Sequence, residues 1–123
     1  MEIKISFNLG ILLYIVAVIL FVPLTIINFV CVLVKYGVKW VTIDSFFYET
    51  AVDIDRFGNR NFRTLWNATL QKNGYRFGNI NETISSALGK NKINNTLTTA
   101  GKVLCFILDT LDENHCIKSI QND

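Results

Sequence analysis

The chain has 123 residues, half of them hydrophobic, and a formal net charge of +2. About 70 to 80 residues remain once a long apolar segment at the start is set aside, near the lower limit for one self-sufficient core, so several soluble domains are excluded. The charge is uneven: Arg56 to Lys102 holds eight basic residues against Glu82 alone, and the rest of the chain after Lys102 is acidic.

The apolar segment Ile5 to Val34 carries no formally charged side chain. As a helix it would be roughly 45 Å long, more than the roughly 30 Å of a bilayer's hydrocarbon core. Residues 1–34 are therefore predicted to form a transmembrane anchor. The start lacks the clustered positive charge of a secretory signal, so the anchor is expected to be retained. Pro23 predicts a kink; a re-entrant hairpin there is an alternative, although each arm would be too short to cross.

Residues 35–52 are predicted to continue this helix as an amphipathic segment in the headgroup layer. Apolar side chains recur there at helical spacing, with lysines on another face. The alternative is that this stripe packs on the soluble domain. The residues expected at the membrane interface are Lys35, Tyr36, Lys39, Trp40 and Phe47. Because two lysines follow the span and one precedes it, the positive-inside tendency predicts an outside N-terminus and a cytoplasmic C-terminal domain.

Residues 53–123 are predicted to form a small helical domain, and the whole chain to be all-α. Residues 53–61 are expected to be a connector and 61–72 a helix, capped at Asn73-Gly74, where a hairpin turn is the alternative. A short helix is expected from an Asn81 cap to Gly89, then a polar loop over 90–95. A last helix follows Thr98 or Thr99; because 103–108 is apolar on every side, it is either central or pressed against something apolar outside its domain.

The basic block is a candidate patch for an anionic partner, formed by Arg56, Arg60, Arg63, Lys72 and Arg76. Aromatic residues are interleaved with these charges, as in proteins that bind phosphates and stack bases. The same charges would suit an anionic leaflet or a protein partner. We weigh a solvated or lipid-facing surface first, a protein partner second and nucleic acid third.

His115 and Cys116 are the residues that most invite a chemical role. A zinc site needs about four ligands, usually in spaced pairs, and a Cys–His catalytic pair must meet from different parts of the fold. Adjacent residues satisfy neither requirement, so the pair is expected to cap or pack. No phosphate-binding loop or hydrolase motif is present. The sequence therefore predicts no catalytic residue, no metal and no cofactor, and a protein that is not an enzyme.

Two minor features of composition complete the expectations. The three cysteines are an odd number, and Cys31 lies within the apolar segment, so a disulfide framework is not expected and a reducing compartment is. The abundant asparagines are interpreted as a consequence of AT-rich coding. The sequons at Asn67, Asn81 and Asn94 are expected to carry no glycans.

Two short motifs resemble a group of small bacteriophage and prophage proteins of unknown function. These proteins share an ET(I/L)S segment and a closing DxxHC, often behind an apolar N-terminal helix. The matching residues here are Glu82-Thr83-Ile84-Ser85, Asp112 with His115-Cys116, and the stretch from Asp55 to Trp66. The resemblance covers about residues 53 to 120 and implies a phage origin without an activity.

Together these features predict a membrane-anchored structural or organising protein of a phage. It would be a minor membrane protein of a virion with an internal membrane, or part of an assembly at the host inner membrane. The expected partners are the lipid bilayer and a capsid or other membrane protein, or further copies of the chain. The alternatives are a holin-like lysis protein and a membrane-tethered nucleic-acid-binding protein.

Overall fold

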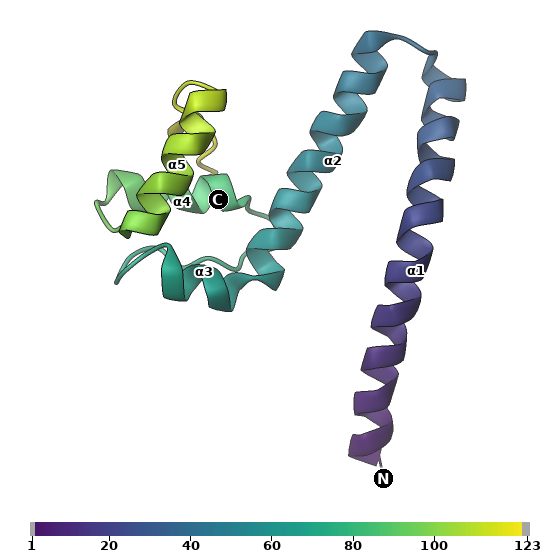
Figure 1. Ribbon diagram of the computed structural model, residues 1–123, viewed down its shortest axis with the longest axis horizontal. Coiled ribbons are helices and arrows are strands. Elements are labelled where there is room, and N and C mark those ends of the chain that lie inside the picture. The colour runs from purple at the N-terminus through teal and green to yellow at the C-terminus, as the bar shows by residue number, and fades with distance from the viewer. Residues whose placement is uncertain (1, 122–123) are drawn as a thin grey trace. The chain divides into compact units, whose positions relative to one another are not determined.

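The computed structural model describes the backbone of residues 2–121 and the side chains of residues 8–121. This part of the chain is helical, without a strand, which confirms the all-α prediction. The chain forms two compact units, residues 1–47 and 48–123. Figure 1 shows the course of the helices. Their bounds are α1 Glu2–Tyr36, α2 Trp40–Asn61, α3 Arg63–Thr69, α4 Ile84–Ile93, α5 Thr99–Leu111 and α6 His115–Lys118.

Helix α1 is long and apolar enough to cross a membrane over Asn8–Tyr36. None of this segment is buried, so it is not the core helix of a soluble domain. The helix continues through Pro23, which excludes a re-entrant hairpin at that residue. Proline removes a backbone donor, and two residues further on the Thr25 hydroxyl donates to the Phe21 carbonyl at 2.6 Å.

A break at Gly37 separates α1 from α2. Gly37 has φ +93°, a conformation that side chains disfavour. The continuous helix that the sequence predicts through residues 35–52 is therefore interrupted, and α2 begins at Trp40. Within the first unit the chain doubles back: the Phe29 ring lies 4.9 Å from Phe46 and 5.5 Å from Phe47, measured between centroids. These aromatic contacts hold the start of α2 against α1.

The connector predicted for residues 53–61 is instead the last part of α2. Gly58 and Asn59 are buried there, because Gly58 lets the helix approach Ile84 of α4. The helical ladder stops at Phe62, and α3 starts one residue later. The Trp66 indole donates to the Gly58 carbonyl at 3.1 Å, which fixes α3 against the end of α2. Helix α3 ends at Thr69, before the predicted 72.

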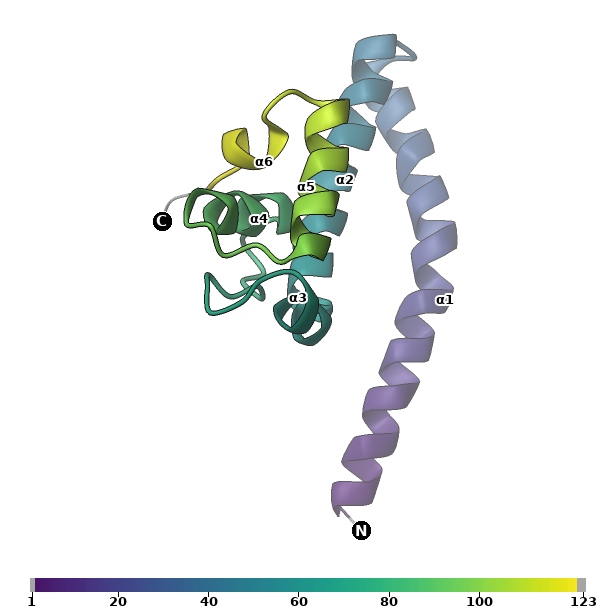
Figure 2. The same cartoon turned by 60° about the vertical axis from the view of Figure 1, so that its left-hand side comes forward.

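The C-terminal helices α4, α5 and α6 pack on one another (Figure 2). Thr83, not Asn81, caps α4 by accepting from the Ser86 amide at 3.0 Å. Helix α4 also passes through Gly89 to Ile93, so most of the predicted loop is helical. Thr98 caps α5 as predicted, accepting from the Gly101 amide at 3.1 Å. An isolated bridge pairs Gln71 with Leu97 and closes the domain between α3 and α5.

The core of the second unit is small and unusually polar. Its buried apolar side chains are Leu70, Phe77, Ala87, Leu88, Cys105 and Cys116. Its buried polar side chains are Asn59, Gln71, Glu82, Thr83, Ser85, Ser86 and Asn91. Buried polar groups destabilise a fold unless they are hydrogen-bonded, so their partners hold this domain together.

The asparagines have structural roles that the codon-bias interpretation missed. Asn91 is fully buried; its Oδ1 accepts from the Tyr75 amide at 2.9 Å and its Nδ2 donates to the Ala87 carbonyl at 2.9 Å. Asn59 is also fully buried, and its Nδ2 donates to the Glu82 carbonyl at 2.8 Å. Asparagines also take left-handed backbone at positions 73, 95 and 114, where this residue type is tolerated.

Candidate functional site

The residues predicted for the membrane interface lie on both sides of the Gly37 break. Tyr36 and Trp40 are exposed, and so is Phe47 despite its contact with Phe29. The Lys35 ammonium lies 5.2 Å from the centre of the Tyr36 ring. Lys39 lies between the helices and is exposed. These residues present aromatic and basic side chains next to the long apolar helix.

In the second unit, the side chain of Glu82 is an acid that is only 3% exposed. Its carboxylate accepts from the Tyr75 hydroxyl and the Ser86 hydroxyl, each at 2.6 Å. It also pairs with the Lys90 ammonium at 2.7 Å. Lys90 in turn lies 4.3 Å from the centre of the Tyr75 ring. The one acid within the basic block is therefore the centre of a buried ion-pair cluster.

This cluster predicts loss of stability at high pH. The hydrogen bond to Glu82, together with burial, raises the pKa of Tyr75 above its usual 10.0. Burial acts to lower the pKa of Lys90, but its bonds to Glu82 and Tyr75 outweigh this and raise the pKa above 10.5. Both groups hold their protons more tightly in the folded than in the unfolded chain. Their stabilisation is therefore complete below about pH 10 and is lost as the pH rises through the folded pKa values.

Urea unfolding of the full chain in detergent, followed by tryptophan fluorescence between about pH 8 and pH 11, measures this effect. We expect the free energy of unfolding to fall over that range. We also expect Lys90→Met and Tyr75→Phe to flatten the fall, whereas Tyr48→Phe, at an exposed tyrosine, leaves it unchanged. A fall of equal slope in all four proteins would contradict the assignment to this cluster.

A second polar chain joins α2, α4 and α6. The Asp55 carboxylate accepts from the Ile84 amide at 2.7 Å and lies 3.3 Å from the Ser85 hydroxyl. His115 Nε2 lies 3.1 Å from the same hydroxyl, and His115 Nδ1 lies 3.0 Å from an Asp112 oxygen. Burial raises the pKa of Asp55, although the bond from Ile84 opposes this. Asp55 and Asp112 are thus linked through Ser85 and His115.

The Ser85–His115–Asp112 distances resemble those of a hydrolytic triad. The direction in which the Ser85 hydroxyl donates its proton instead favours a structural role for these residues. A triad serine must donate its proton to the histidine. Here the Ser85 hydroxyl also faces the Asp55 carboxylate, which can only accept while ionised. The Ser85 hydroxyl donates to Asp55 Oδ2 at 3.3 Å, so its single proton is not directed at His115. Ser85 is also buried, so the arrangement locks three helices together.

The structure pairs Cys105 of α5 with Cys116 of α6 in a disulfide, with their Cα atoms 6.2 Å apart. Because no disulfide framework was expected from three cysteines, the sequence reasoning missed this single pair, which forms where a turn at Asn114 returns α6 onto α5. Asp109 lies beside them, and its Oδ1 accepts from the Cys116 amide at 3.0 Å. This bond, with one from Lys92, lowers the pKa of Asp109.

The same three side chains, Cys105, Asp109 and Cys116, lie close enough to suggest a metal site. Their present contacts do not favour one. The two sulfurs bind each other, and the Lys92 ammonium lies 2.9 Å from Asp109 Oδ2, where it repels a cation. Three donors also fall short of the four that structural zinc takes. The cluster fits a cross-link rather than a cation.

Reducing this cross-link is expected to lower the free energy of unfolding by about 2 to 4 kcal/mol, because the unfolded chain gains conformational freedom. Thermal melts of the full chain in detergent, with and without dithiothreitol, give the difference. Cys105→Ser should abolish the effect of the reductant, whereas Cys31→Ser should retain it, since Cys31 is a free cysteine. Equal melts for the oxidised and reduced chain would contradict the cross-link.

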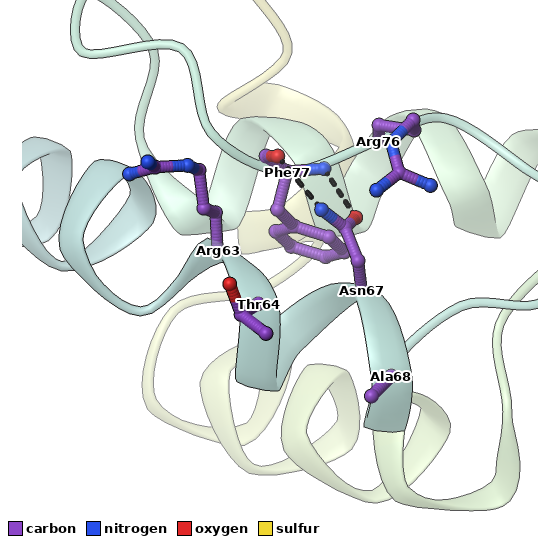
Figure 3. Close-up of a pocket in the computed structure, with 6 residues that line it drawn as sticks. All are labelled: Arg63, Thr64, Asn67, Ala68, Arg76 and Phe77. Carbon is purple, nitrogen blue, oxygen red and sulfur yellow. Dashed lines mark hydrogen bonds between the residues drawn. The ribbon is translucent and has the colours of Figure 1, made fainter.

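An open groove runs along α3 and is walled by basic side chains. One part, of about 500 Å³, is lined by Arg63, Thr64, Asn67, Ala68, Arg76 and Phe77 (Figure 3). A second part shares Asn67, Ala68 and Arg76 with the first and reaches Lys72 and Thr98. Among the side chains of residues 8–121, none that lines either part is acidic. We call this surface the basic groove.

Asn67 builds the groove by holding the segment after α3 in place. Its Oδ1 accepts from the Phe77 amide at 2.7 Å, and its Nδ2 donates to the Phe77 carbonyl at 3.0 Å (Figure 3). Phe77 is buried, so its neighbour Arg76 is presented at the surface. Arg63 stands on the opposite wall and donates to the Arg60 carbonyl at 2.7 Å. The Arg76 guanidinium therefore lies on the side of a fixed carboxamide, whereas the Arg63 guanidinium is turned away from it (Figure 3).

The predicted patch is only partly gathered in the groove. Arg63, Lys72 and Arg76 line it, whereas Arg56 and Arg60 do not. Arg60 is exposed on α2. Arg56 is half-buried, and its Nε has no hydrogen-bond partner among the described residues.

A search of protein-family models, curated proteins and solved structures with this chain found no match.

Proposed function

We propose that this chain is a phage-encoded, membrane-anchored organising protein, in which α1 spans the bilayer and the C-terminal domain docks an anionic protein partner in the basic groove. The observation that supports it best is the combination of a long, unburied apolar helix with a separately packed domain in one short chain. The partner would belong to a capsid or to another assembly at the membrane. The phage origin depends on the motif resemblance alone.

The groove supports a docking role through charge and rigidity. Arg63, Lys72 and Arg76 contribute three positive charges without an acidic neighbour in the lining. Among the described residues, none of the three takes part in a salt bridge. Their charge is therefore free for a partner, and the Asn67 bonds limit the conformational cost of binding.

The aromatic side chains favour a protein partner over nucleic acid. Base stacking needs exposed rings beside the basic residues. Phe77 is buried, the Tyr75 hydroxyl is bound to Glu82, and Trp66 is half-buried with its indole nitrogen bound to Gly58. Phe57 and Phe62 are exposed, but neither lines the basic groove, so among the described residues no exposed ring is available for stacking in the groove itself.

The proposal retains the cytoplasmic orientation of the domain, because Lys35 and Lys39 follow the apolar helix. Cytosolic thiols stay reduced, so Cys105 and Cys116 would then be thiols in the host and pair after the protein leaves the cytosol. Because both cysteines are buried in the folded domain, infected cells are quenched in trichloroacetic acid, and the denatured protein is then alkylated with N-ethylmaleimide and analysed by mass spectrometry. Modified Cys105 and Cys116 are expected; an oxidised pair in unlysed cells would refute the cytoplasmic orientation.

The proposed role is tested by following the tagged protein through infection. It should travel with virions or with membranes, and a defined partner should be recovered after detergent extraction. The double change Arg63→Glu with Arg76→Glu should abolish that recovery, whereas Lys118→Glu on α6 should not. Because the interaction is between exposed charges, recovery should also decline with added salt.

Three results would contradict the proposal. Recovery of the intact chain in solution without detergent would contradict the proposal that α1 anchors it in a membrane. Rapid loss of membrane potential on expression of the chain alone would favour the holin-like alternative. Steeply salt-dependent binding of the full chain to DNA, lost in the double variant, would favour the nucleic-acid-binding alternative.

A further inference from the structure

One face of α5 is apolar and uncovered. Val103, Phe106, Ile107 and Leu111 are spaced as one helical stripe and are 54%, 71%, 51% and 81% exposed. The opposite side of α5 packs in the domain through Gly101 and Cys105. An exposed apolar stripe on a domain of this size indicates a site of contact with a protein or a membrane.

The chemistry of this α5 stripe suits the boundary between lipid and water. Thr110 is the one hydroxyl on the face, and its Oγ1 donates to the Phe106 carbonyl at 2.8 Å, so it needs no water. Lys102 and Asp109 lie along one edge of the stripe rather than within it, and Lys92 holds Asp109 at 2.9 Å. A lysine at such an edge can keep its charge in water while its chain covers apolar surface.

The size of the stripe argues against a second copy as its occupant. A stable protein interface uses roughly 20 to 30 residues on each side, and four side chains are far fewer. A bilayer needs no such area, because a tethered domain meets its surface at high effective concentration. This step depends on the proposed function, in which α1 is the tether.

We infer that the α5 stripe docks on the surface of the same bilayer that α1 crosses, with Phe106 and Leu111 among the acyl chains. The domain is then fixed at the membrane by two contacts, a spanning helix and an interfacial one. Interfacial binding of this kind adds buried apolar area to the attraction between basic residues and anionic lipids. The occupant is a lipid surface and not a protein.

Photo-crosslinking of the full chain tests this inference. The photoreactive amino acid p-benzoylphenylalanine is placed at position 106, or at position 93, an exposed residue at the end of α4, or at position 16 within α1. Each protein is reconstituted in vesicles of phosphatidylethanolamine and phosphatidylglycerol, irradiated and analysed by mass spectrometry. Lipid adducts are expected at positions 16 and 106, with severalfold less at position 93.

The outcomes separate the inference from the proposed function. Lipid adducts at position 16 without any at position 106 would leave the anchor in place and overturn the docking of α5. Crosslinks from position 106 to a second copy, or to residues of the same chain, would identify a protein occupant and likewise overturn it. Absence of lipid adducts at position 16 would overturn the anchor itself.

Discussion

Replacing Glu82 with alanine is expected to lower the free energy of unfolding of the C-terminal domain by about 3 to 5 kcal/mol, the usual effect of breaking a buried ion pair. The change removes the acceptor of two hydroxyl groups and leaves the Lys90 ammonium, 19% exposed, without its counter-charge. A domain of this size is stabilised by only about 5 to 10 kcal/mol, so the loss should be visible as a large fall in the urea midpoint.

The matched control is Glu113→Ala, because Glu113 is exposed and lies outside the cluster. Its effect should stay within about 0.5 kcal/mol. Lys90→Met, alone and with Glu82→Ala, completes a double-mutant cycle. If the Glu82–Lys90 ion pair stabilises the domain, the free energy of unfolding of the double variant should fall by much less than the sum of the two single falls. Additive losses would show that Glu82 acts through some other contact.

Replacing Gly89 with alanine is expected to cost about 4 kcal/mol or more, beyond the usual range for a tight core. A Cβ at this position would collide with the Cys116 carbonyl oxygen, and it would lie 2.7 Å from Ile120 Cγ1. The carbonyl belongs to backbone and cannot rotate aside. Helix α6 would have to move from α4, which would also separate His115 from Ser85.

Gly10→Ala is the control, since among the described residues no heavy atom beyond the adjoining helix backbone lies within 4 Å of the position that its Cβ would take. Thermal melts in detergent should place this variant at or slightly above the parent chain, because alanine favours helix. If Gly89→Ala unfolds near the parent temperature, α6 does not sit on α4 as described. Amide hydrogen exchange of α6 in the parent chain would then show whether packing on α4 protects this helix.

The features that follow from periodicity were accessible to sequence reasoning. Uniform apolarity identified α1, and the spacing of Val103, Leu104, Ile107 and Leu108 identified α5 together with its Thr98 cap. The same reasoning missed the second half of α2, because Asp53, Gly58 and Asn59 are locally typical of a turn. Burial of Gly58 and Asn59 against the rest of the domain overrides that local preference.

Contacts between residues distant in sequence were not accessible in the same way. Ser85 and His115 are 30 residues apart, and nothing local indicates that they touch. The disulfide was missed because an odd cysteine count obscured a pair formed by two of the three. Glu82 could have been singled out, since one acid among eight basic residues is a natural candidate for an ion pair. The groove could not be predicted, because it depends on how Asn67 holds the segment around Phe77.

The turn at Gly37 has a consequence for the proposed span, because it determines how much of α1 is free of contacts with α2. The ring contacts between Phe29 and the start of α2 place polar backbone and a second helix beside the last turns of α1. Counted from Asn8, the stretch that precedes this aromatic clasp rises roughly 33 Å at about 1.5 Å per residue. That length matches the roughly 30 Å thickness of hydrocarbon. If α1 spans the bilayer as proposed, these aromatic contacts would limit how deeply the helix enters the hydrocarbon, and lengthening the stretch before them by one helical turn would tilt the helix.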